Sequence, residues 1–248
     1  MTFALETRNL TKRFDGFVVT NDVSLKIAQG ARHALIGPNG AGKTTIINLL
    51  TGALAADSGQ VLLIGEEITA LPAHKRVGRG LTRTFQINQL FGDFTPLESV
   101  MLAISEREGR GRLGWRALAS ERAIIDEGAA ILERFRLADV MGSPTTLLPY
   151  GKQRLLEIAL AIAAKPRVLL LDEPAAGVPE EERHEVLALV RELPADVTVV
   201  LIEHDMDLVF SFADRISVLA AGALFAEGTV AEISKDPQVK AIYLGEDA

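Results

Sequence analysis

Three short runs rich in apolar, β-branched or leucine residues divide the chain, and polar residues follow each of them. They are ARHALIG (residues 31–37), RVLLLDEP (residues 167–174) and TVVLIEHD (residues 198–205). Apolar runs without alternation indicate strands buried on both faces, as in a parallel sheet covered by helices. Ligands of such sheets bind beyond the carboxyl ends of the strands. The polar residues that close these runs are therefore the first candidates for a site.

Helical patterns alternate with these strands. Apolar residues recur at helical spacing in residues 43–54, 152–165 and 180–193. This alternation predicts an α/β fold with a doubly wound, mostly parallel sheet. Residues 3–14 and 19–27 instead alternate between apolar and polar positions. They predict an antiparallel β subdomain at the N-terminus, with FDGF (residues 14–17) as its turn.

The middle of the chain has a different character. From residue 88 to about residue 147 no convincing strand occurs, and helix-like runs cover residues 96–104 and 120–135. We therefore predict a helical subdomain inserted into the core. Residues 105–120 mix Gly with Arg and carry the only tryptophan, Trp115, which indicates a solvated loop or an amphipathic contact to a partner or membrane surface. The predicted single domain over residues 1–248 has its core and β subdomain at 1–87 and 155–226, its helical subdomain at 88–154 and a tail at 227–248.

Composition and charge narrow the classes of function. The chain has 248 residues and a formal net charge of -7, which argues against a nucleic-acid partner, since such binding needs concentrated Lys and Arg. The absence of cysteine excludes disulfides, thiol chemistry and Cys-ligated zinc. The N-terminal segment does not resemble a signal peptide, and no run approaches the ~18 apolar residues that span a bilayer. If the protein works at a membrane, another chain must cross it.

The strongest motif is GPNGAGKTT (residues 37–45), which matches the phosphate-binding pattern G-x-x-x-x-G-K-[ST]. It follows a predicted buried strand and opens a predicted helix, as a P-loop requires. Backbone N–H groups of the loop would cradle phosphates. The loop residues with this role are Gly37, Asn39, Gly40 and Gly42. Lys43 would reach the terminal phosphates, the Thr44 hydroxyl would ligate Mg²⁺, and Thr45 would add a hydrogen bond.

Polar side chains at the other strand ends add candidate chemistry. Asp172 would bind magnesium, usually through water, and Glu173 would activate an attacking water. Alone, two adjacent acids could equally cap the turn that follows. His204, at the end of the third run, could donate to the γ-phosphate or be a satisfied core histidine. Gln86 in RTFQINQLF, at the entry to the helical insert, is an uncharged amide able to reach both magnesium and the attacking water.

Together these motifs resemble one family. The P-loop, Gln86, the segment LLPYGKQR (residues 147–154), LLLDEP and His204 occur in the order and spacing of ABC transporter ATPase subunits, over essentially the whole chain. The resemblance implies a P-loop NTPase fold of the ABC ATPase type, ATP and Mg²⁺ as ligands, and ATP hydrolysis with Glu173 as general base. It also implies that Phe14 stacks on adenine, although a ring at this place also suits ordinary sheet packing.

The resemblance further implies two ATPase subunits, identical or related, that close head to tail around two ATP molecules. Residues 147–154 would form the signature segment, which covers the γ-phosphate held by the other subunit. Its nucleotide-binding residues would be Tyr150, Gly151, Lys152 and Gln153, whose backbone N–H groups at a helix start would face that phosphate. Closing and opening of the pair would drive transmembrane permease subunits. The protein would then be peripheral, at the cytoplasmic face of the inner membrane.

A narrower resemblance rests on GLTRTFQINQLFGDFTPLESVMLA and on the tail EGTVAEISKDPQVKAIYLGED. Both are similar to the ATPase of branched-chain amino acid importers, which implies uptake of such a small solute, delivered by a periplasmic solute-binding protein. The tail is also similar to that of the lipopolysaccharide-export ATPase, but RTFQ and the tyrosine of the signature favour the importer. The receptor and the permeases select the solute, so this chain does not identify it.

Two departures from the family pattern leave another alternative open. Pro149 stands where the signature usually has Ser, and the missing hydroxyl corresponds to about 1.5–3 kcal/mol of closed-dimer stabilisation. The segment AAGVPEE after Pro174 lacks the acid often found there. Weak or partner-dependent hydrolysis is therefore a hypothesis that stays open, with a nucleotide-binding coupling module as the alternative. An ABC-type ATPase that acts on DNA or ribosomes is disfavoured, because the chain has neither a long coiled coil nor a second cassette.

Overall fold

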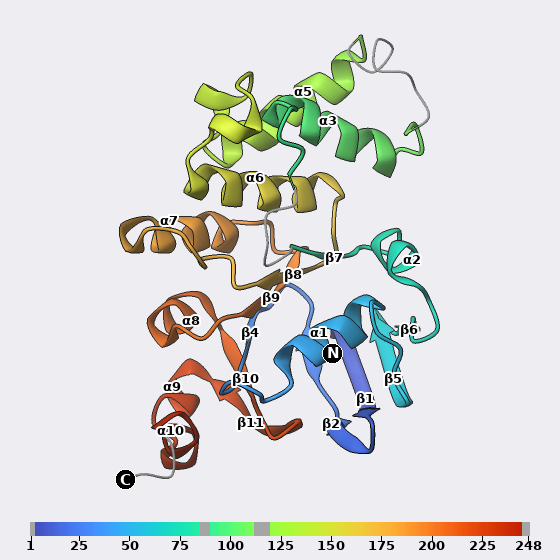
Figure 1. The fold of residues 1–248 in the computed structure, drawn as a ribbon, viewed down its shortest axis with the longest axis vertical. Helices are drawn as coiled ribbons and strands as arrows, with labels where there is room; N and C mark the ends of the chain where they lie inside the picture. Colours follow the sequence, from blue (N-terminus) through green and yellow to red (C-terminus); the bar gives the residue numbers. More distant parts are fainter. Residues whose placement is uncertain (1–2, 85–89, 112–119, 245–248) are drawn as a thin grey trace. The chain divides into compact units, whose positions relative to one another are not determined.

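The computed structural model describes residues 3–84, 90–111 and 120–244, and the chain forms two compact units (Figure 1). The first unit comprises residues 1–83, 167–173 and 193–248, and the second comprises residues 84–166 and 174–192. Each unit is described by itself. The predicted single domain, with boundaries after residues 87, 154 and 226, stays a prediction.

A six-stranded sheet forms the centre of the first unit. Its strands are β4 (Arg32–Ile36), β7 (Leu81–Arg83), β8 (Val168–Asp172), β9 (Thr198–Ile202), β10 (Arg215–Ala220) and β11 (Ala223–Thr229). Their order is β11-β10-β4-β9-β8-β7, and all pairs are parallel except β10 with β11. The three apolar runs are β4, β8 and β9, and every residue of these strands is buried. The prediction of doubly covered parallel strands is confirmed.

An antiparallel sheet occupies the N-terminal part of the same unit. Its strands are β1 (Phe3–Phe14), β2 (Phe17–Val23), β3 (Lys26–Ala28), β5 (Ser58–Leu63) and β6 (Glu66–Glu67). The order is β2-β1-β5-β6, and β3 pairs with β1. Phe14 pairs with Phe17 across the predicted FDGF turn, where Asp15 and Gly16 have positive φ values of 47° and 90°. Two consecutive residues of this kind give the tight turn that matches the twist of a hairpin, so the predicted β subdomain is confirmed.

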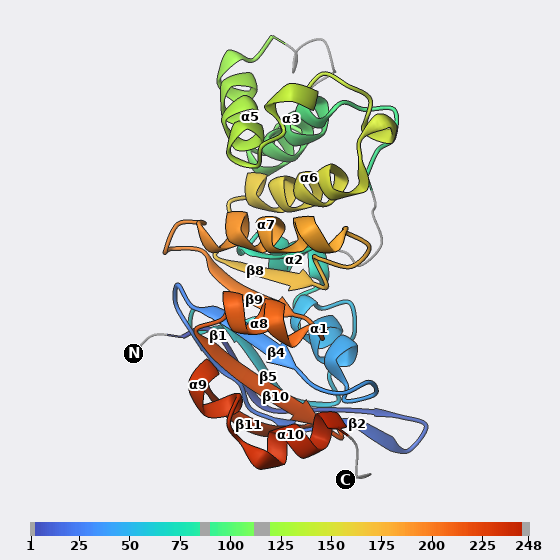
Figure 2. The same ribbon diagram turned by 90° about the vertical axis from the view of Figure 1, so that its left-hand side faces the viewer.

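Helix α1 (Lys43–Thr51) packs in the core that the two sheets share. Its buried side chains are Ile46, Ile47, Leu49 and Leu50. They belong to one hydrophobic cluster with Leu5 and Leu10 of β1 and Leu170 of β8. Figure 2 shows α8 (Met206–Phe212) and α9 (Val230–Ile233) covering the six-stranded sheet. The unit also contains α2 (Ala73–Val77) and α10 (Pro237–Leu244). This packing fixes the start of α1 just beyond the carboxyl end of β4.

The second unit is helical throughout the part that the structure describes. Its helices are α3 (Pro96–Arg107), α5 (Arg122–Arg134), α6 (Tyr150–Ala163) and α7 (Glu180–Arg191), with the short 3-10 helices η1 (Ala138–Val140) and η2 (Thr145–Leu147). Helices α3 and α5 match the two predicted runs, and a capping box between Thr95 and Glu98 sets the start of α3. The predicted helical subdomain is confirmed. Among the described helices, none is long and apolar enough to cross a membrane.

Candidate functional site

The phosphate-binding loop begins directly after β4. Gly37 lies against Leu219, and a Cβ atom at this position would collide with the carbonyl oxygen of Leu219. Gly40 and Gly42 have positive φ values of 80° and 94°, and a Cβ atom on Gly42 would come within 2.8 Å of the carbonyl oxygen of Val19. Backbone conformation and space thus require glycine. Because Gly42 is the N-cap of α1 and has no side chain to offer, the first N–H groups of α1 suit an anionic ligand.

Lys43 is folded back onto this loop. Its Nζ donates to the carbonyl oxygens of Gly37 (2.6 Å) and Pro38 (3.0 Å). Burial lowers the pKa of Lys43, and the charges of Glu173 and Asp172 raise it in part. The ammonium group therefore lies within electrostatic range of both predicted carboxylates. The carbonyl oxygens of the loop hold the ammonium group of Lys43, and a terminal phosphate would compete with them for this group.

The remaining predicted residues of the loop differ in exposure. Asn39, Gly40 and Thr44 are exposed, and Thr45 is partly buried. The Thr44 hydroxyl at the first turn of α1 is thus accessible to an ion. The P-loop residues lie together as the motif predicts, and their roles toward a nucleotide stay predictions.

Asp172 and Glu173 follow one another at the carboxyl end of β8, but their surroundings differ. Asp172 is 5% exposed, and its Oδ2 lies 2.7 Å from Nη2 of Arg83. Glu173 has a φ of 47°, its N–H donates to the carbonyl oxygen of Ile202 at 2.9 Å, and its side chain is 23% exposed. A buried, paired carboxylate suits a metal ligand. A more exposed one suits proton transfer.

His204 lies beside Glu173, as the shared edge of the sheet predicts. Its Nδ1 is 3.5 Å from Oε1 of Glu173 and 3.8 Å from Oε2 of Glu203. The Glu203 carboxylate also accepts the backbone N–H of His204 at 3.2 Å, while the imidazole is 64% exposed. A largely exposed ring is no core histidine. Its proximity to Glu173 is compatible with the predicted contact to a γ-phosphate.

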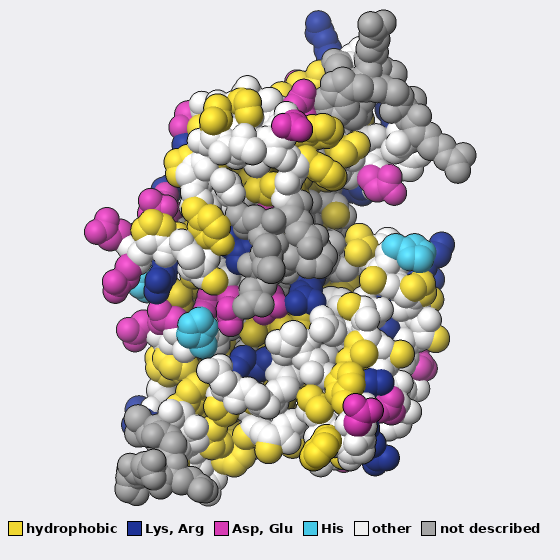
Figure 3. Space-filling model, viewed as in Figure 1, with side chains coloured by type: hydrophobic (Ala, Val, Ile, Leu, Met, Phe, Trp, Pro, Cys, Tyr) yellow, Lys and Arg dark blue, Asp and Glu magenta, His cyan; other side chains and the backbone are white. Residues whose placement is uncertain are grey.

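Phe14 ends β1 with its side chain accessible. The residue is 44% exposed, and Nζ of Lys12 lies 5.6 Å from the centroid of its ring. Figure 3 shows hydrophobic side chains at the surface over β1 and β2, and Phe17 is 78% exposed. The ring is open enough to stack on a base, which ordinary sheet packing would prevent.

Gln86 lies outside the described residues, because the structure describes none of residues 85–89. The chain before it is described: β7 ends at Arg83, and Thr84 is buried. The predicted role of Gln86 toward magnesium and water stays a prediction.

The signature segment lies in the second unit, at the start of α6. Pro149 is its N-cap, and Tyr150 is 40% exposed. Lys152 forms an ion pair with Asp139. Gly151 packs close to α7, since a Cβ atom there would collide with a carboxylate oxygen of Glu182. The segment therefore forms the start of α6, which packs against α7 of the same unit.

One detail of the predicted signature is wrong. We expected free backbone N–H groups from Tyr150 to Gln153, but the N–H of Gln153 donates to the carbonyl oxygen of Pro149 at 3.0 Å. The helix starts at Tyr150, so Pro149 supplies the first helical acceptor. The three N–H groups before Gln153 have no acceptor within the helix. The amide side chain of Gln153 also donates within the unit, to Leu148 O at 2.9 Å.

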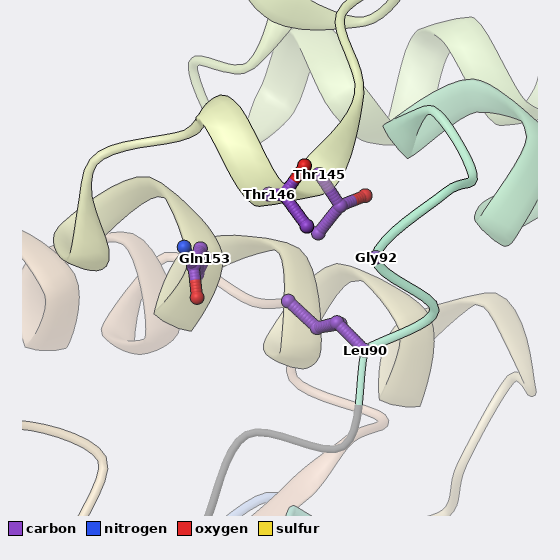
Figure 4. Close-up of a pocket in the computed structure, with 5 residues that line it drawn as sticks. All are labelled: Leu90, Gly92, Thr145, Thr146 and Gln153. Carbon is purple, nitrogen blue, oxygen red and sulfur yellow. The ribbon is translucent and has the colours of Figure 1, made fainter.

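A pocket of about 260 Å³ lies beside this helix start. Figure 4 shows its lining, which consists of Leu90, Gly92, Thr145, Thr146 and Gln153. Hydrogen bonds from Thr145 and Thr146 to the backbone of residues 92 and 94 join two of its walls. Sequence reasoning missed this pocket because its walls come from three separate segments.

Three polar residues near the acids were also missed. Glu203 is 2% exposed and contacts His204. Arg83 contacts both Asp172 and Oδ1 of Asn48, the latter at 2.8 Å. Glu203 adjoins a predicted residue and could have been found from TVVLIEHD. Arg83 and Asn48 stand in separate segments of the sequence and carry no such signal.

Comparison with known proteins gives consistent matches. The family model described as "ABC transporter" matches residues 20–176, and "Branched-chain amino acid ATP-binding cassette transporter" matches residues 223–248. The chain is 42% identical to the high-affinity branched-chain amino acid transport ATP-binding protein BraF of Pseudomonas aeruginosa, covering 98% of both chains. It is 38% identical to LivG of Escherichia coli, which carries the same description, over 98% of both chains.

A solved structure agrees with these relatives. The crystal structure of the ADP conformation of an ATP-binding cassette from an ABC transporter superposes with a TM-score of 0.85 at 32% sequence identity, covering 99% of both chains. The predicted fold class is confirmed by this similarity over almost the full length.

Proposed function

The chain belongs to the ABC transporter ATP-binding family, and we propose that it is the ATP-hydrolysing subunit of an importer for branched-chain amino acids. One observation carries the hydrolytic role: the phosphate-binding loop follows β4, and Asp172 and Glu173 stand at the carboxyl end of β8 in the same parallel sheet. A phosphate-binding loop beside a buried acid and an accessible one is the arrangement that phosphoryl transfer to water needs.

Nucleotide binding uses the loop and the edge of the antiparallel sheet. Gly37, Asn39, Gly40 and Gly42 place backbone N–H groups around the phosphates, and Lys43 exchanges its two loop carbonyls for the terminal phosphates. Thr45 adds a hydrogen bond. The exposed ring of Phe14 stacks on adenine.

Magnesium fits the oxygen donors at this site. Thr44 offers a hydroxyl and Asp172 a carboxylate, and oxygen is the ligand that Mg²⁺ prefers. The described residues contain no group of three or more His, Cys, Asp or Glu side chains able to hold a metal, so the nucleotide and water would supply the other oxygens. When bound, the ion neutralises charge on the phosphates. Gln86 is proposed as a further ligand.

Glu173 is the general base. Its carboxylate removes a proton from the water that attacks the γ-phosphate, and Gln86 orients the same water. His204, 3.5 Å from Glu173, donates to the γ-phosphate. Because the positions of Glu173 and His204 are fixed by neighbouring parallel strands, β8 and β9, both groups reach the same point beyond the sheet edge.

Two copies, or this chain and a related one, close around two ATP molecules. The helix start at Tyr150, Gly151 and Lys152 presents N–H groups to the γ-phosphate held by the other subunit, and the Gln153 side chain lies next to them. Pro149 supplies no hydroxyl here, so recognition relies on the backbone. This interface is where a weak or partner-dependent rate would originate.

Import of a branched-chain amino acid is supported by the descriptions of both relatives and by the C-terminal family match. These favour import over lipopolysaccharide export. The ATPase pair would bind transmembrane permease subunits at the cytoplasmic face of the inner membrane, and a periplasmic solute-binding protein would deliver the solute. Deletion of the gene should abolish high-affinity uptake of labelled leucine, isoleucine and valine. Uptake that is unchanged for all three would refute this solute class.

Hydrolysis is tested with Glu173→Gln. This variant should retain ATP binding and lose phosphate release, because an amide cannot accept the proton of water. Glu67→Gln is the matched control, since Glu67 is an exposed carboxylate of the same unit and its loss should leave the rate unchanged. Equal rates for wild type and Glu173→Gln would reject Glu173 as the base.

A further inference from the structure

Arg83 contacts Asp172, a predicted ligand of magnesium, and Asn48 on α1, the helix that carries the predicted ligand Thr44. Its Nη2 lies 2.7 Å from Oδ2 of Asp172, and its Nη1 lies 2.8 Å from Oδ1 of Asn48. The Arg83 and Asp172 side chains are only 15% and 8% exposed. We propose that Arg83 is a positioning residue, which sets the spacing between Asp172 and the first turn of α1 and thereby the selectivity of the site for Mg²⁺. This inference rests on the proposed function.

The contact between Arg83 and Asn48 matters because of where Asn48 lies on α1. Asn48 lies on α1 four residues after Thr44, so the two side chains occupy the same face of the helix one turn apart. Thr44 is the predicted hydroxyl ligand. A guanidinium that holds Asn48 with one nitrogen and Asp172 with another therefore fixes the distance from α1 to the end of β8.

Arginine suits this task. Its planar group presents several donors in a fixed geometry, whereas the ammonium of lysine is a point charge on a flexible stem. Partners that orient a metal-binding carboxylate typically matter 10–100-fold for metal affinity, by the order of magnitude seen at other sites. Arg83 engages Oδ2 of Asp172, which fixes the rotation of the carboxylate. It comes from β7, a different element from either ligand.

Two cations of equal charge and different size distinguish a positioning role of Arg83 from a purely electrostatic role. Mg²⁺ demands near-ideal octahedral geometry, while Ca²⁺ is larger and accepts flexible coordination. Both ions carry the same charge, so a purely electrostatic effect of Arg83 would change the affinity for their ATP complexes equally. A change in spacing would alter the ratio of the two affinities. This ratio is therefore the readout.

The experiment measures binding of trinitrophenyl-ATP by fluorescence, in Mg²⁺ and in Ca²⁺, for the full-length protein. In Arg83→Met the ratio of the Ca²⁺ dissociation constant to the Mg²⁺ dissociation constant should fall about tenfold. Asn48→Ala, which leaves every charge in place, should move it in the same direction. Arg83→Lys should lie in between. The control Arg79→Met removes an exposed arginine that pairs with Glu66 and should stay within about twofold of wild type.

Each result either supports or overturns the positioning role of Arg83. If the two dissociation constants change together in Arg83→Met, or neither changes, the positioning role is overturned. If Arg83→Met does not fold, Asn48→Ala decides alone: a lowered ratio supports the proposal and an unchanged ratio overturns it. A wild-type protein without preference for Mg²⁺ would overturn the proposed metal site together with this inference. A wild-type preference that survives both substitutions would overturn the inference alone.

Discussion

Replacing Glu173 by glycine and by alanine separates catalysis from backbone strain. The φ of Glu173 is 47°, in the left-handed region that costs a residue with a Cβ atom roughly 1–2 kcal/mol. Glycine has no such cost but loses about 0.5–1 kcal/mol of additional chain entropy on folding. Both substitutions remove the same carboxylate, so the loss of its contacts cancels from the comparison. Glu173→Gly should therefore be more stable than Glu173→Ala by about 0.5–1 kcal/mol, the difference between the two costs.

The assay is thermal unfolding of the nucleotide-free protein, followed by circular dichroism. For a chain of this size, 1 kcal/mol corresponds to a shift in Tm of about 2–4 °C. Phosphate release should be lost in both variants, because neither carries a base. If Glu173→Ala unfolds at the same temperature as Glu173→Gly or above it, the left-handed conformation stores no strain, and the reasoning is refuted.

The remaining predictions concern stability. Burial lowers the pKa of His33 to about 4, so wild type should lose up to about 3 kcal/mol as the pH falls from 6.5 to 4, because the unfolded state then binds the extra proton. A His33→Gln variant should lack this component in urea titrations; the same pH slope would contradict it. Arg154→Met should cost about 3–5 kcal/mol, because it removes one partner of the buried ion pair between Arg154 and Glu157, and unchanged urea unfolding would count against that. Gly177→Ala should lower the Tm, because φ is 76° and the new Cβ atom would lie 2.8 Å from the ring of Tyr150; a raised Tm would exclude this clash.

The parts of the fold that the sequence predicted are those whose signal lies within one short segment. Strands β4, β8 and β9 are five residues each and buried throughout, so each is mostly apolar and lacks the polar alternation of a strand with one exposed face. Strand β7 has only three residues, LTR, which is too short for any periodicity. Helix α6 begins directly after Pro149, which agrees with the predicted helix start at this proline. The sequence does not show which of the first N–H groups already donate within the helix, so the N–H of Gln153 was wrongly assigned as free.

The candidate site divides in the same way. The P-loop, Asp172 and Glu173 stand in contiguous motifs, and a motif fixes its own local geometry. Arg83 contacts partners 35 and 89 residues away in the sequence, so only the folded sheet brings the three side chains together. No feature of the sequence around Arg83 shows whether its side chain bridges two other residues or is solvated.

The adjacent acids show how the backbone assigns chemistry that side-chain identity leaves open. Successive side chains of an ideal strand point to opposite faces of the sheet. If β8 continued, the side chains of Asp172 and Glu173 would therefore lie on opposite faces. The left-handed conformation of Glu173 ends that alternation directly after Asp172, which is the last residue of β8. Asp172 stays buried beside Arg83, whereas Glu173 turns toward the exposed imidazole of His204. One strained residue thus separates a fixed, cation-paired carboxylate from an accessible one, and this difference is what the proposed roles of Asp172 as a metal ligand and Glu173 as a base require.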